Sequence, residues 1–123
     1  MTDNHTLGRY AEDAAAKYLV SLGWRILERN ARNKYGELDI IAEDPKSDEL
    51  VVVEVRCRTE NKFQSATDSV YGHKMNILKR SGSLYMESIG WEGFWRIDVV
   101  GITVNDRNNL EDWTIEHIRD ITG

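Results

Sequence analysis

Residues 36–58, GELDIIAEDPKSDELVVVEVRCR, contain two apolar runs separated by a polar stretch that holds the only proline of the chain. The apolar, β-branched segments 37–42 and 50–58 predict two strands, and segment 43–49 predicts a turn between them. We therefore expect an antiparallel hairpin. Three charged residues occupy positions where a core would take only valine or isoleucine: Asp39, Glu54 and Arg56.

The chain before this hairpin contains a helix signal and a strand signal. Apolar and small residues recur at helical spacing over residues 7–22, which predicts an amphipathic helix. Residues 24–29 alternate and predict a short strand, and the basic stretch 30–35 predicts a loop.

The chain after the hairpin predicts one more helix and two more strands. Residues 72–88 keep helical spacing, although Gly82 weakens a helix by about 1 kcal/mol relative to alanine. Residues 94–104 and 113–118 predict strands on either side of the polar turn 105–109. The order helix, three strands, helix, two strands indicates an α/β protein with a mixed sheet flanked by helices. The second helix can return the chain parallel to the third strand.

Composition limits the function classes. A chain of 123 residues with 41% hydrophobic residues predicts a single domain, residues 1–123. Its one cysteine excludes an internal disulfide and a multi-thiolate zinc site, and its histidines lack ligand spacing. No apolar stretch approaches the roughly 18 residues of a membrane span, so we expect a cytoplasmic protein without membrane contact. The net charge of −5 argues against a protein that coats nucleic acid through bulk charge.

The charges of the hairpin are grouped on its strands. A turn centred at residues 46–47 places Asp39 opposite Glu54. The same register places Glu37 opposite Arg56. Because like charges opposite each other destabilise a sheet, Asp39 facing Glu54 requires a proton or a cation.

Spacing alone leaves two interpretations open. A divalent metal would neutralise Asp39 and Glu54, since hard cations prefer carboxylate oxygens. Alternatively, Glu37 pairs with Arg56 and Glu54 pairs with Arg58, as salt bridges on a solvated face.

Several segments together resemble a known family: GRYAEDAAAKYLVSLGWRILERNARNKYGELDIIA, VVVEVRCR, SVYGHKMNIL and FWRIDVVGI. In this order and spacing, from residue 7 to residue 104, they are similar to the YraN-like family of small bacterial proteins. That family belongs to the PD-(D/E)XK nuclease superfamily and is similar to archaeal Holliday junction resolvases. The resemblance implies a restriction-endonuclease-like αβββαβ core.

The resemblance also implies an active site. Asp39 matches the acidic residue of the superfamily's second strand, Glu54 matches the acid of its E-x-K triplet, and both would bind Mg²⁺ or Mn²⁺. Glu12 matches the glutamate that resolvase-like members bring from the first helix to the metal. The implied activity is metal-dependent phosphodiester hydrolysis of branched DNA by an endonuclease that works as a homodimer.

Arg56 departs from the family pattern, which has lysine there. Lysine can release its proton when buried, whereas arginine keeps its charge. Arg56 can hold a phosphate or stabilise a transition state, but it cannot act as a general base. This leaves water activation to the metal or to a neighbour such as Lys74, which matches a basic position of the family at the start of the second helix.

Further basic residues around the implied site are expected to contact DNA phosphates. These residues are Arg9, Arg29, Arg32, Lys34, Arg58 and Lys74. Asp98 is expected to be structural and to pair with Arg96 or with a buried donor. Two alternatives to a nuclease remain: a nucleic-acid-binding module with weakened catalysis, and a protein-interaction domain, which would show no salt-dependent DNA binding.

Overall fold

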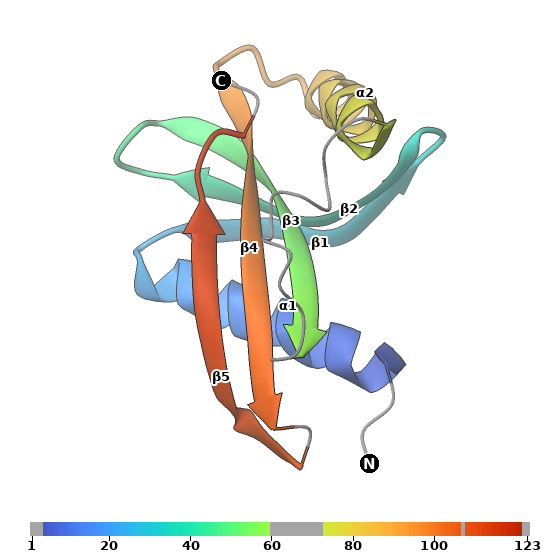
Figure 1. Ribbon diagram of the computed structural model, residues 1–123. Coiled ribbons are helices and arrows are strands. Elements are labelled where there is room, and N and C mark those ends of the chain that lie inside the picture. Colours follow the sequence, from blue (N-terminus) through green and yellow to red (C-terminus); the bar gives the residue numbers. More distant parts are fainter. Residues whose placement is uncertain (1–3, 60–72, 107, 122–123) are drawn as a thin grey trace.

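Five strands form one mixed sheet and follow one another in space in the order of the sequence (Figure 1). A computed structural model describes residues 4–59, 73–106 and 108–121 of the chain. Its elements are α1 (Asn4–Ser21), β1 (Arg25–Asn33), β2 (Gly36–Asp44), β3 (Glu49–Thr59), α2 (His73–Ser88), β4 (Trp95–Asp106) and β5 (Asn109–Ile118). This order confirms the predicted α/β class and matches a restriction-endonuclease-like core.

The strand directions also follow the prediction. The neighbours β1 and β2, β2 and β3, and β4 and β5 pair antiparallel, whereas β3 and β4 pair parallel. The helix α2 connects the parallel pair, because a chain that leaves one strand must cross back before it can start a parallel neighbour. Residue 72, the predicted first residue of this helix, lies outside the described residues.

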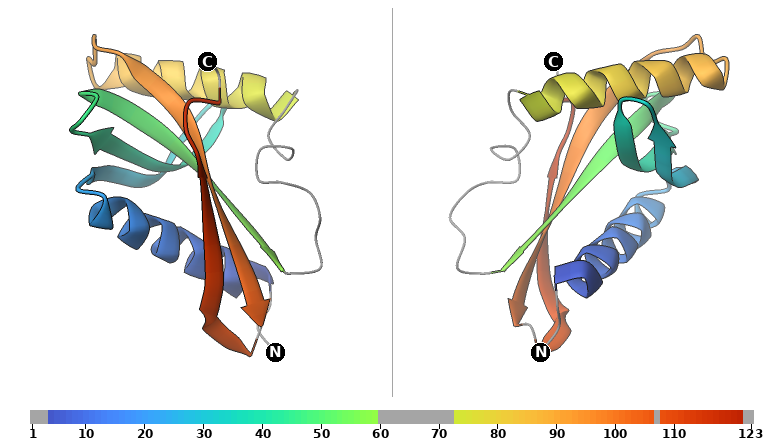
Figure 2. Two further views of the ribbon diagram at one scale, coloured as in Figure 1. Left: turned by 60° about the vertical axis from the view of Figure 1, so that its left-hand side comes forward. Right: turned by 90° about the vertical axis from the view of Figure 1, so that its right-hand side faces the viewer.

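The two helices cover opposite faces of the sheet (Figure 2). Because side chains alternate along a strand, Val51 and Val53 of β3 face α1, whereas Leu50 and Val52 face α2. The α1 cluster contains Leu7, Ala11, Ala14, Ala15, Leu19, Trp24, Ile40, Ala42, Val51, Val53, Val100, Ile102 and Val104. The α2 cluster contains Ala31, Leu38, Ile41, Leu50, Val52, Met75, Leu78, Met86, Ile97 and Val99.

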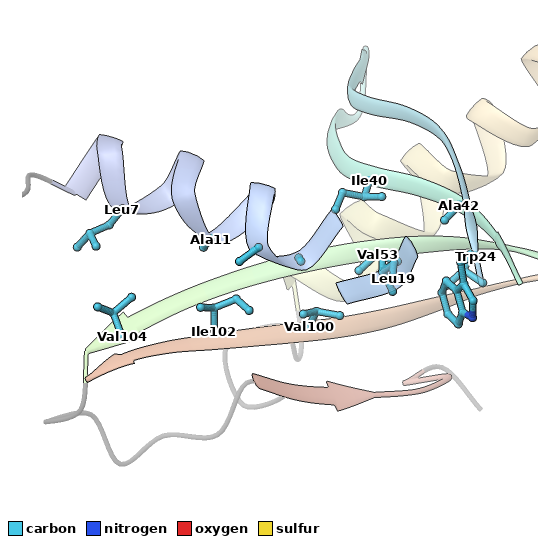
Figure 3. Close-up of a cluster of buried hydrophobic side chains, with 13 residues drawn as sticks. Leu7, Ala11, Leu19, Trp24, Ile40, Ala42, Val53, Val100, Ile102 and Val104 are labelled. Carbon is cyan, nitrogen blue, oxygen red and sulfur yellow. The ribbon is translucent and has the colours of Figure 1, made fainter. Parts of the chain in front are cut away.

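The helix α1 lies close to the sheet because its inner face carries small side chains. Figure 3 shows Leu7 of α1 near Val104 and Ala11 near Ile102. Each fully buried leucine, isoleucine or valine contributes about 1.5–3 kcal/mol, and the alanines between them let the helix backbone approach the strands. Neither helix in the described parts of the chain is long and apolar enough to span a membrane.

The strands are longer than the sequence predicts. The prediction of a strand ending at residue 29 and a basic loop over 30–35 is wrong, because β1 continues to Asn33 and pairs with β2. Strand pairing uses the backbone, so the polar side chains of this stretch do not prevent it. One of them, Arg32, forms a salt bridge with Glu37 at 2.7 Å across the strands. The last strand, β5, likewise begins at Asn109, before the predicted residue 113.

Gly82 lies on the buried side of α2, against β4. A Cβ atom at this position would lie 2.6 Å from Cζ3 of Trp95, which is closer than van der Waals contact allows. The glycine that weakens the helix locally therefore allows α2 to pack against the Trp95 ring.

Replacing Gly82 with alanine is expected to lower the free energy of unfolding by about 1 kcal/mol. The cost of overpacking, about 1–3 kcal/mol, exceeds the gain of about 1 kcal/mol in helix propensity. Urea denaturation measures the change. Ser83→Ala at the exposed neighbouring position is the control and should be neutral or slightly stabilising. A Gly82→Ala protein that is more stable than the wild type would contradict this account.

Candidate active site

The alternation of β2 breaks at Asp39. Leu38 packs in the α2 cluster and Ile40 in the α1 cluster, although residues two apart on a regular strand face the same side. The pairing of β2 with β3 ends at Ile40 and Val53. Beyond this pair, Oδ2 of Asp39 accepts a hydrogen bond from the backbone N–H of Val55 at 2.9 Å. Where the pairing of β2 with β3 stops, the Asp39 carboxylate thus replaces a backbone carbonyl as the acceptor for the Val55 N–H of β3.

The predicted register is confirmed in the part of the hairpin where β2 and β3 pair, with Ile40 opposite Val53. The prediction that Glu37 lies opposite Arg56 is wrong. The β2–β3 ladder ends at Ile40 and Val53, so neither this pair nor the predicted pair of Asp39 and Glu54 is part of it. On its other edge, β2 places Glu37 opposite Arg32 of β1.

Cross-strand salt bridges within the hairpin do not account for its charges. Among the described residues, Glu54 pairs with Arg56 of its own strand and with Lys74 of α2, and its predicted pairing with Arg58 is wrong. Glu54 lies on the face of the sheet that α2 covers, and it therefore contacts Arg56 and Lys74, which lie on the same face.

Glu54 is buried, with a side chain only 4% exposed. Lys74, in the first turn of α2, places Nζ 3.3 Å from Oε2 of Glu54, and Nη2 of Arg56 lies 3.5 Å from the same oxygen. Within the described part of the chain this oxygen accepts no hydrogen bond, so both contacts are ion pairs without hydrogen-bond geometry.

Asp39 and Glu54 are not ladder partners, yet their carboxyl groups interact. Burial, a hydrogen bond to Asp39 and the negative charge of Asp39 together raise the pKa of Glu54 to about 8, while Lys74 and Arg56 act in the opposite direction. Asp39 thus disfavours the ionised form of Glu54, and a proton on Glu54 or an added cation would relieve this repulsion.

The helix α1 brings Glu12 to the same region. Burial and then the charge of Asp39 raise the pKa of Glu12, against the opposing effects of Arg29 and Asn30. Its Oε1 lies 3.6 Å from Nη2 of Arg29. Asp39 therefore interacts electrostatically with both Glu54 and Glu12.

The three carboxyl groups do not converge on one point. In residues 4–59, 73–106 and 108–121, no three Asp, Glu, His or Cys side chains lie close enough to share a metal ion. The predicted ligands Glu12, Asp39 and Glu54 therefore do not form such a group, although Asp39 interacts electrostatically with each of the other two.

A pocket of about 860 Å³ lies between α1 and the β1–β2 hairpin, and of the three predicted ligands Glu12 lines it. Its wall carries three basic side chains, Arg9, Arg29 and Arg32, and three acidic ones, Glu12, Asp13 and Glu37. The structure thus brings three of the predicted phosphate-contacting residues to one surface.

The other predicted basic residues lie elsewhere. Lys34 places Nζ 5.2 Å from the centre of the Tyr35 ring and does not line the pocket. Arg58 is half-buried on β3, and Lys74 contacts Glu54. One pocket residue, Asn30, is absent from the predicted site, because a strand residue with an unusual backbone angle has no marker in the sequence.

Arg96 forms a separate buried ionic network, which confirms the structural role expected for Asp98. Its guanidinium contacts Asp98 at 2.9 Å, Asp44 at 3.1 Å and Glu49 at 2.8 Å, and His117 contacts Asp98 at 2.8 Å. The Arg96 network is well paired and joins β4 to the β2–β3 turn and to β5.

The raised pKa of Glu54 predicts a specific pH dependence of stability. Between the ordinary glutamate value of 4.5 and about 8, the folded state holds this proton and the unfolded state does not. The free energy of unfolding of the wild type should therefore fall relative to that of Glu54→Gln as the pH rises from about 5 to about 8. Urea denaturation at several pH values in EDTA measures this.

The control for this comparison is Glu111→Gln, an exposed position on β5. It should keep the pH dependence of the wild type. Equal pH dependence in the wild type and in Glu54→Gln would show that Glu54 titrates normally.

Comparison with known proteins gives one consistent family. The uncharacterised protein family UPF0102 matches residues 11–102. A UPF0102 protein of Mycobacterium sp. (strain KMS) is 44% identical over 101 residues, covering 80% of this chain and 73% of the relative. A UPF0102 protein of Chlorobium chlorochromatii (strain CaD3) is 40% identical over 116 residues, covering 93% and 88%. The chain therefore belongs to the YraN-like family UPF0102, within the restriction-endonuclease-like superfamily.

Proposed function

We propose that this protein is a metal-dependent nuclease that hydrolyses phosphodiester bonds in DNA, with branched DNA as its substrate. The observation that supports this most is the buried Glu54 carboxylate, which contacts Lys74 and Arg56 beside an Asp39 that Val55 holds in place. A homodimer is part of the proposal, by similarity to junction resolvases.

The carboxyl pair fits a divalent metal ion. Mg²⁺ is usually held by one or two carboxylates, with waters and substrate phosphate oxygens completing its octahedron. Asp39 and Glu54 would supply such a pair. The buried Oε2 of Glu54 accepts no hydrogen bond from the described residues, and a metal ion would share it with the ion pairs of Lys74 and Arg56. Glu12 would act through an intervening water. When bound, Mg²⁺ or Mn²⁺ supplies a nucleophile at neutral pH and neutralises charge on the phosphate.

Lys74 provides an amine that can transfer a proton, which the guanidinium of Arg56 cannot do. Both side chains reach the same oxygen of Glu54, so both lie next to the position of the scissile phosphate in this proposal. Arg56 keeps its charge and would stabilise the charge that develops on the phosphate. An amine such as that of Lys74 can also exchange a proton with the attacking water or the leaving oxygen.

The pocket between α1 and the β1–β2 hairpin is the proposed contact surface for the DNA phosphate backbone. Three arginines, Arg9, Arg29 and Arg32, line it together with three acids. Arg29 pairs with Asp13 at 2.8 Å and Arg32 pairs with Glu37 at 2.7 Å, and DNA phosphates would compete for these cations. The arginines of the pocket would then be the main contacts of the DNA backbone. The rest of the surface would contribute little to affinity.

The Asp39→Asn variant is expected to cut DNA at least about 100-fold more slowly than the wild type, because loss of a metal ligand removes several kcal/mol of transition-state stabilisation. The assay uses the full chain with junction, flap and linear DNA in Mg²⁺ or Mn²⁺. Cleavage should stop in EDTA.

The matched control is again Glu111→Gln, which removes an acid from the far edge of the sheet. It should cut at the wild-type rate. Wild-type protein that cuts none of these substrates, or an Asp39→Asn variant that cuts as fast as the wild type, would refute the enzymatic proposal.

Lys74→Ala is expected to reduce the cleavage rate of bound DNA by about 100-fold, the lower end of the range for lost general acid–base catalysis. Single-turnover cleavage and fluorescence anisotropy separate this rate from DNA affinity. Lys79→Ala, an exposed lysine on the same helix, should leave the rate unchanged. Weaker binding with an unchanged rate would mean that Lys74 only contacts phosphate.

Arg56 favours a second candidate, a nucleic-acid-binding module that has lost most of its catalysis. It predicts DNA affinity that falls as salt rises and does not require metal, with no turnover. It also predicts no gain of turnover in Arg56→Lys. Restored cleavage in that variant would show instead that the arginine alone impairs the enzyme.

A further inference from the structure

Asn30 has an unusual backbone conformation for a residue inside a strand. Its φ angle is +56°, in the left-handed region that non-glycine residues rarely adopt. Its neighbours set its place, since Arg29 pairs with Ile40 and Ala31 pairs with Leu38. This register puts Asn30 opposite Asp39, where the alternation of β2 breaks. The two irregularities therefore occur at the same point of the hairpin.

The side chain of Asn30 connects two acids. With its amide nitrogen turned toward them, Asn30 donates one hydrogen bond to Oε1 of Glu12 and one to Oε1 of Glu37, each at 3.0 Å. The opposite amide orientation would point the carbonyl oxygen at carboxylates and lose both bonds. All three residues line the pocket between α1 and the β1–β2 hairpin.

Glycine would adopt this backbone conformation with less strain, so the conformation alone does not require asparagine. Asparagine is one of the few other residues that tolerate it, and its amide adds two donors. The side chain of Asn30 is exposed, so packing in the core does not explain its presence either. The distinctive contribution of Asn30 is its pair of hydrogen bonds to Glu12 and Glu37.

We propose that Asn30 is a positioning residue, which ties Glu12 of α1 to Glu37 of β2 and so holds Glu12 toward Asp39. As a role in the reaction, this inference rests on the proposed function. Such partners of metal-binding side chains usually change metal affinity or activity by about 10–100-fold when removed.

The test variant is Asn30→Gly, which keeps the left-handed backbone accessible and removes only the amide. In the metal-free protein, the carboxyl ¹³C resonances of Glu12 and Glu37 should both shift, and the melting temperature should stay close to that of the wild type. The dissociation constant for Mn²⁺, measured by isothermal titration calorimetry, should rise about 10–100-fold.

The control is Asn105→Ala, which removes another asparagine–carboxylate contact, to Asp112 at 3.1 Å between β4 and β5. It should leave the Mn²⁺ affinity and the Glu12 resonance unchanged. Because this variant also loses an amide, it separates a local effect from a general one.

Each readout tests a different step of the inference. Unshifted resonances of Glu12 and Glu37 in Asn30→Gly would overturn the tie itself. Shifted resonances with unchanged Mn²⁺ affinity would overturn its role in metal binding. Wild-type protein that binds no Mn²⁺ would refute the proposed function and that role together, whereas shifted resonances would still support the tie.

Discussion

The hydrogen bond from the backbone N–H of Val55 to Asp39 is the constraint on which the candidate site depends. A β-sheet normally satisfies such a group with the next strand. Here the pairing of β2 with β3 has ended at Ile40 and Val53, and a side chain replaces the missing backbone acceptor. One contact thus satisfies the backbone of β3 and fixes an acid beside Glu54. Substituting Asp39 would therefore affect both the sheet and the chemistry of the site.

Two buried ionic groups in this protein show how differently charge can be paired. At Asp98, burial alone would raise the pKa, but hydrogen bonds from His117 and Arg96 outweigh it and lower the pKa. At Glu54, burial and the neighbouring Asp39 dominate, and the ion pairs with Lys74 and Arg56 do not offset them. A well-paired network suits a structural role, whereas an acid kept close to another acid is a functional-site candidate.

The order of the elements and the hairpin register could be predicted, because periodicity and turn position are local properties of the sequence. The break at Asp39 could not, since it depends on β2 packing Leu38 and Ile40 into different clusters. Asn30 escaped prediction because nothing in the sequence marks its left-handed backbone conformation within β1. The acids Asp39 and Glu54 were recognised from a family pattern. Lys34 and Arg58 were predicted because they lie close to the acids in the sequence. Neither side chain lines the pocket between α1 and the β1–β2 hairpin.

Lys74 illustrates how core packing determines the electrostatics of the candidate site. Its contact with Glu54 depends on the position of α2, and that position is set by Leu78 and Met86 of the α2 cluster and by the close approach of Gly82 to Trp95. Arg56 lies on the same strand as Glu54, whereas Lys74 lies on the helix α2. A change in the apolar face of α2 would therefore alter one ion pair of Glu54 and leave the other in place, so this face of the core belongs to the site as much as the charged residues do.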